Sequence, residues 1–145
     1  MSHDESLEAV AAARRAAADR LVTPWWYHPV LGVLVGGFIV AVALGDWGVT
    51  LVGVAVFFAG IYLLMATYRR QTGIWISGHT PGPANRWASL MGTVAGLGAA
   101  GAILLGFVEV PDVVIWMMAA VVAVAIVPIG RQYDRVLRAD LRGEL

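Results

Sequence analysis

The chain has 145 residues, 59% of them hydrophobic, and its mean hydropathy of +0.75 is too high for an ordinary soluble domain of this length. Its ten basic residues are all arginine and balance ten carboxylates, so the formal net charge is +0. The absence of cysteine excludes disulfides, thiolate metal sites and thiol redox chemistry.

Residues 1–24 predict an amphipathic cytoplasmic helix. Leu7 and Val10 belong to an apolar stripe at helical spacing, while arginines gather toward the end that meets the membrane. Pro24 is expected to stop this helix. The acids mixed among these arginines differ from the basic and then apolar order of a signal peptide, so we expect the first apolar span to stay in the mature protein.

Four apolar stretches follow that contain no Asp, Glu, Lys or Arg. A helix needs roughly 20 residues, at about 1.5 Å each, to cross a hydrocarbon core of about 30 Å. Stretches of this length predict an all-α integral membrane four-helix bundle in residues 25–130. The expected spans are residues 25–44, 49–67, 87–108 and 113–130.

The connections predict two helical hairpins. The turns at 45–48 and 109–112 are so short that the helices on either side of each must be antiparallel neighbours. The segment 69–86 is rich in glycine and proline, so we expect a loop there. The tail, residues 131–145, has arginines on one side and apolar residues on the other, which predicts an amphipathic helix on anionic lipid.

The arginines also predict the orientation. All of them lie in the N-terminal segment, the 69–86 loop or the tail, and the only charged residues of the two short turns are acidic. The positive-inside rule therefore places both termini and the long loop in the cytoplasm. We expect a multi-pass protein of the bacterial inner membrane.

Two stretches support this architecture by resemblance. Residues 18–29 contain Thr23-Pro24-Trp25-Trp26-Tyr27, and residues 68–75 read Tyr-Arg-Arg-Gln-Thr-Gly-Ile-Trp. With these stretches the chain resembles small four-helix membrane proteins of actinobacteria that have no assigned activity. The resemblance covers most of the chain and implies the four-helix architecture, but it implies no catalytic or binding residue.

Small residues at intervals of four indicate where helices pack closely. In membranes, such residues let two helix backbones approach each other. They can join two copies of the chain or two helices of one chain, or their spacing can be chance in a chain rich in glycine and alanine. Packing of either kind places Gly96 where two helix backbones nearly touch. The predicted packing residues are Ala88, Gly92, Gly96 and Ala100 in the third span, and Gly32 and Gly36 in the first.

Arginines beside interfacial aromatic residues form the predicted binding surface. Such a set can hold a lipid phosphate or an acidic partner segment. The alternative is that the arginines only set the topology and the aromatic residues form an ordinary interfacial belt. The residues are Arg69, Arg70, Arg86, Trp75 and Trp87, flanked by Arg20 and Arg131.

The sequence predicts no catalytic residue, metal site or cofactor. No carboxylate, lysine or arginine lies within the four spans, which argues against a proton-coupled transporter. The three histidines lack ligand spacing, and a lipid-modifying enzyme would need clustered acids where only Asp19 and Asp134 lie near the spans. We expect a non-enzymatic accessory or scaffold component; a small transport or permeation protein and a lipid-binding protein are the alternatives. Expected partners are membrane lipids, a second copy or a larger membrane complex, and no nucleic acid.

The arginine distribution makes a direct topology prediction. Reporter fusions after Gly48 and Asp112 should read as external, and fusions after Gly78 and Leu145 as cytoplasmic, because no arginine lies near the two short turns. A phosphatase and fluorescent-protein reporter pair measures this in cells. A cytoplasmic signal at Gly48 would contradict four spans.

Overall fold

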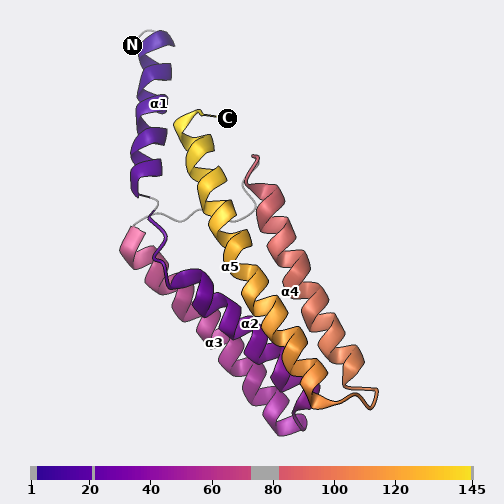
Figure 1. The fold of residues 1–145 in the computed structure, drawn as a ribbon. Coiled ribbons are helices and arrows are strands. Elements are labelled where there is room, and N and C mark those ends of the chain that lie inside the picture. The colour runs from indigo at the N-terminus through magenta and orange to yellow at the C-terminus, as the bar shows by residue number, and fades with distance from the viewer. Residues whose placement is uncertain (1–2, 21, 73–81, 145) are drawn as a thin grey trace.

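The computed structural model describes residues 3–20, 22–72 and 82–144 and is all-helical over these residues, which confirms the predicted all-α class (Figure 1). It has five helices in this part of the chain. They are α1 (His3–Arg20), α2 (Tyr27–Leu44), α3 (Trp47–Thr72), α4 (Asn85–Leu105) and α5 (Asp112–Arg142).

Helices α2 to α5 are long and apolar enough to cross a membrane, as predicted. Most helix boundaries differ from the expected ones by one to three residues, and the ends of α3 and α5 differ by more. α3 continues to Thr72, four residues into the expected loop. α5 runs unbroken through Pro128 to Arg142, so the expected tail helix is the last part of α5. It ends at Gly143, whose left-handed φ of 72° is typical of a helix stop.

A tight turn joins α2 to α3. Asp46 precedes α3, and its Oδ1 accepts a hydrogen bond from the Val49 backbone N–H at 2.9 Å, which satisfies a free donor of the first turn. The Thr50 hydroxyl donates to the Ala41 carbonyl at 3.1 Å. Further along the hairpin, the rings of Phe38 and Phe57 lie 4.8 Å apart. These contacts hold α2 and α3 side by side and antiparallel.

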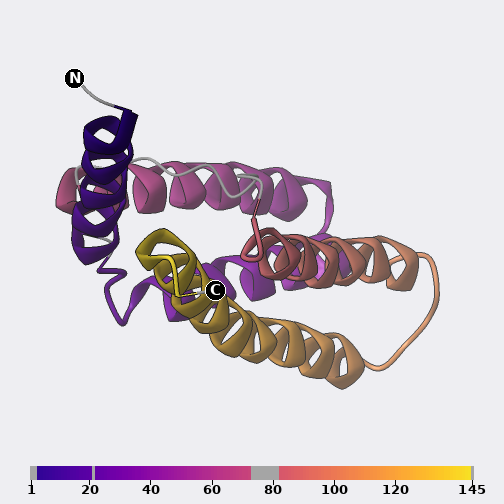
Figure 2. The same cartoon turned by 90° about the horizontal axis from the view of Figure 1, so that it is seen from above.

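Helix α2 is central to the packing because it contacts α3, α4 and α5, while α4 also contacts α5. Viewed from above, α3 and α5 lie on opposite sides of α2 (Figure 2). Ile39, Ala102 and Ile126, from α2, α4 and α5, are fully buried where these three helices meet. The core of the molecule is therefore built around α2, α4 and α5.

Helices α2 and α5 approach each other closely. A Cβ placed on Gly32 would touch the Ala123 carbonyl oxygen, and one on Gly36 would lie 3.2 Å from the Ala119 carbonyl oxygen. Both glycines are buried. The absence of a side chain at these two positions is what lets the two backbones approach.

The predicted stripe on α4 lies elsewhere. Gly92, Gly96 and Ala100 are exposed, and a Cβ on Gly92 or Gly96 would meet nothing within 4 Å in the described part of the chain. In the described part of the chain, Gly96 therefore makes no close contact with a second backbone, which differs from the expectation for packing within one chain. Instead, α4 turns Gly98 toward α2 and α5, because glycine and alanine occur on both faces of this helix and their spacing alone selects neither. Packing of the stripe between copies stays a prediction.

Helix α1 lies at the end of α2 to α5 where Tyr27, Thr72, Asn85 and Arg142 are found, called here the arginine end (Figure 1). It contacts α5, and Ala18 is buried in this contact. Leu7 and Val10, from the predicted apolar stripe, are exposed.

Replacement of glycine by alanine should have opposite effects on stability at the close contact of α2 with α5 and on the exposed stripe of α4. Gly32→Ala should lower the thermal midpoint in detergent, because the new methyl group meets a backbone carbonyl, and overpacking typically costs about 1–3 kcal/mol. Gly96→Ala is the matched control. It has open space around it, and alanine is favoured in a helix interior by about 1 kcal/mol, so its midpoint should stay or rise. Equal losses in both variants would contradict the close contact of α2 and α5.

Candidate functional site

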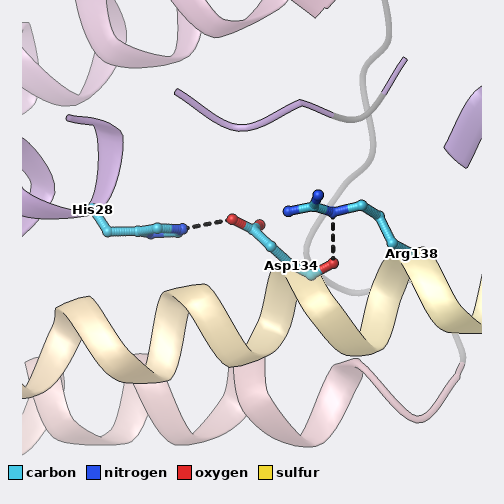
Figure 3. A network of polar contacts seen from close by, with 3 residues as sticks. All are labelled: His28, Asp134 and Arg138. Carbon is cyan, nitrogen blue, oxygen red and sulfur yellow. Dashed lines mark hydrogen bonds and ion pairs between the residues drawn. The ribbon is translucent and has the colours of Figure 1, made fainter. Parts of the chain in front are cut away.

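A histidine–aspartate pair joins α2 to α5 at the arginine end. His28 Nε2 lies 2.8 Å from Asp134 Oδ2, and the two side chains are only 6% and 12% exposed (Figure 3). An ionised carboxylate only accepts hydrogen bonds, so Nε2 is the donor. The pair connects positions 106 residues apart in the sequence.

Glycine makes room for this pair. Gly130, one turn before Asp134 on α5, lies against the His28 ring, and a Cβ there would touch His28 Nδ1. On α2, His28 shares the face that carries Gly32 and Gly36 because the three lie at intervals of four. The pair therefore lies on the α2–α5 interface, near its arginine end.

An apolar cavity of about 250 Å³ lies beside the pair, between α2, α3, α4 and α5. We call it the inner cavity. The Tyr27 ring forms one side and lies 5.3 Å from both the His28 ring and the Tyr68 ring. The wall is otherwise made largely by aliphatic and methionine side chains, among them Leu31, Leu64, Met65, Met91 and Leu137.

On the other side of the pair lies a hollow of about 330 Å³ that is lined by arginines. We call it the arginine hollow. Arg131, Arg135 and Arg138 line it from one face of α5, since their spacings of four and three bring them into register. The segment Thr23–Trp25, between α1 and α2, forms the opposite wall. The Arg138 Nε donates to the Asp134 backbone carbonyl at 3.3 Å, which ties this arginine to the helix (Figure 3).

The two spaces share a wall. Thr23, His28 and Asp134 line both the inner cavity and the arginine hollow. A molecule that filled both would pass beside the histidine–aspartate pair, with an apolar part among the helices and a charged part among the arginines.

The geometry of the pair argues for a positioning role rather than acid–base chemistry. A general base must present a nitrogen to its reactant. In His28, Nε2 is occupied by Asp134, and the buried Nδ1 lies against Gly130 without a hydrogen-bond partner among the described residues. The pair thus fastens α2 to α5. Within the searched part of the chain, no three histidine, aspartate or glutamate side chains lie close enough to hold a metal ion.

The predicted binding residues are arranged differently from this site. Arg69 and Arg70 are exposed at the end of α3, and the Arg86 guanidinium lies 5.9 Å from the centre of the Trp87 ring at the start of α4. None of these four lines the inner cavity or the arginine hollow. Trp75 lies outside the described residues, as does the Arg20 side chain. Of the flanking arginines, Arg131 does reach the hollow.

Sequence reasoning missed the His28–Asp134 pair. A usable signal existed in the two series at intervals of four, His28-Gly32-Gly36 and Gly130-Asp134, since each places a polar residue at the end of a small-residue face. The sequence did not indicate that these two faces pack on each other.

Comparisons with protein-family models, with curated proteins and with solved structures found no match.

The pair predicts a measurable coupling energy. In a double-mutant cycle of His28→Ala and Asp134→Ala, the unfolding free energies in detergent should show a coupling of about 1–3 kcal/mol, because each single change leaves a buried polar group without its partner.

The Asp19–Arg142 pair is the matched control. Its side chains lie 3.2 Å apart but are 70% and 46% exposed, and exposed pairs typically contribute less than about 1 kcal/mol. A coupling for His28 and Asp134 no larger than that of this control would mean that the pair does not fasten α2 to α5.

Proposed function

We propose that this protein is a non-enzymatic accessory component of the bacterial inner membrane that binds an anionic lipid at its arginine end. In this proposal α2 to α5 form an integral membrane bundle of two helical hairpins, and both termini and the arginine end face the cytoplasm. The lipid phosphate lies in the arginine hollow and part of an acyl chain lies in the inner cavity.

The outer surface supports the membrane location. Val33, Phe58, Leu97 and Val121, one from each of the four long helices, are 65–70% exposed. Apolar side chains cover this surface on all four helices, and soluble proteins rarely expose apolar patches of that extent. Lipid chains would cover these side chains, so the exposure is favourable in a bilayer.

The observation that carries the lipid proposal is the wall shared by the two spaces. An anionic lipid combines a phosphate with a long apolar chain, and the site combines three guanidinium groups with an apolar cavity at the same wall. Guanidinium groups bind phosphate through paired N–H donors. The apolar cavity can accept part of the chain, because a lipid chain is as apolar as the side chains that line the cavity. Charge complementarity and the neighbouring cavity therefore favour the same class of ligand.

The packing below the inner cavity favours lipid binding over permeation. Ile39, Ala102 and Ile126 are fully buried farther along the helices, where α2, α4 and α5 meet. A small permeation protein would need a polar path between these helices. A cavity that ends on an apolar core is suited to holding part of a ligand.

The arginine hollow can be tested by lipid retention. Replacing Arg131 and Arg135 together with Gln should lower retention of phosphatidylglycerol roughly tenfold to thirtyfold, since a basic residue near an anionic surface contributes about 1 kcal/mol. Native mass spectrometry of the full chain in mild detergent measures this, with phosphatidylcholine as the reference lipid. The pair Arg69→Gln and Arg70→Gln removes the same charge outside the hollow and should have a smaller effect.

The inner cavity provides a second arm of this experiment. Ala88→Phe places a ring in the cavity wall and should weaken phosphatidylglycerol binding, while Ser89→Phe, on the exposed neighbouring position, should not. Equal loss from both arginine pairs would mean general surface attraction. No loss from any of these variants would contradict a lipid site at the arginine end.

A further inference from the structure

Asp134 is a carboxylate in the arginine hollow, where the other charged side chains are those of three arginines. Its Oδ2 is held by His28 (Figure 3), while Oδ1 accepts no hydrogen bond from the described residues. The side chain is 12% exposed and lines both the inner cavity and the arginine hollow. A carboxylate oxygen is thus available at the point where the phosphate and the chain of a bound lipid would meet.

We propose that Asp134 selects the lipid headgroup: the arginine hollow takes a phospholipid whose phosphate carries a neutral hydroxyl-bearing group, and that hydroxyl donates a hydrogen bond to the Asp134 carboxylate. The inference rests on the proposed lipid binding and names the chemistry of the headgroup.

The groups around Asp134 disfavour the other common headgroups. A bare phosphate monoester has about −1.5 to −2 charge near neutral pH; the arginines would attract this charge, but the group carries no alcohol hydroxyl to donate to the Asp134 carboxylate and would place negative charge beside it. An ammonium group would pair with Asp134, but it would also lie among Arg131, Arg135 and Arg138. A neutral hydroxyl group meets neither repulsion, and its hydrogen bond to a carboxylate is of the strong, charge-assisted kind.

His28 makes this selection possible by holding the carboxylate in place. Without the bond to Nε2, the Asp134 side chain would be free to turn toward the neighbouring guanidinium groups and pair with them. The buried imidazole fixes one oxygen at 2.8 Å and leaves the other for the ligand. His28 is therefore a positioning residue for the headgroup contact.

The test compares four lipids with identical acyl chains on the full-length protein in mild detergent: phosphatidylglycerol, phosphatidic acid, phosphatidylethanolamine and phosphatidylcholine. Competition followed by native mass spectrometry should show phosphatidylglycerol bound about tenfold more tightly than phosphatidic acid or phosphatidylethanolamine. This comparison needs no variant, so it holds even if a substitution at the pair unfolds the protein.

Asp134→Asn then tests the residue itself. It removes the negative charge but keeps an acceptor for His28, so the preference for phosphatidylglycerol over phosphatidic acid should fall to less than threefold. Asp140→Asn removes the same charge from α5 outside both spaces and should leave the preference unchanged.

The outcomes separate the two proposals. Equal binding of phosphatidylglycerol and phosphatidic acid, with both tighter than phosphatidylcholine, would overturn the headgroup selection and keep the lipid site. An unchanged preference in a folded Asp134→Asn variant would also overturn the selection. Binding of all four lipids with equal strength would overturn the proposed function as well.

Discussion

The close contact between α2 and α5 is the constraint on which the rest of the structure depends. Helices in a membrane gain little from the hydrophobic effect, so they associate where small residues let backbones and side chains pack tightly. Gly32 and Gly36 bring α2 against the α5 backbone, and Gly130 accepts the His28 ring at the same interface. α3 and α4 are then placed by their contacts with this central pair.

The candidate site follows from that contact. At the arginine end the interface finishes in polar groups, which fix the distance between the start of α2 and the last turns of α5. The inner cavity on one side and the arginine hollow on the other share His28 and Asp134 in their walls. A change at Gly130 would therefore alter the candidate site through His28, although Gly130 has no side chain that lines either space.

Much of the fold could be predicted from the sequence, because four charge-free stretches of membrane length are rare in soluble proteins. Helix ends were less certain: α3 and α5 continue past the expected limits, since an arginine marks where the membrane ends and does not stop a helix. The site could not be derived, because it joins His28 to Asp134 through a choice of packing faces. Small residues occur on several faces of these helices, and only the packed structure distinguishes Gly98, which is buried, from Gly96, which is exposed.

The length of α5 has a consequence for where the arginine hollow would lie in the proposed membrane arrangement. Its 31 residues, at about 1.5 Å each, extend about 46 Å, which exceeds a hydrocarbon core of about 30 Å by about 16 Å. In the proposed membrane arrangement, the last turns, with Arg131, Arg135 and Arg138, would lie at the level of the phosphate layer of one leaflet. A lipid would then reach the hollow by lateral diffusion within that leaflet, so occupancy would follow the local composition of the membrane rather than the concentration of any molecule dissolved in water.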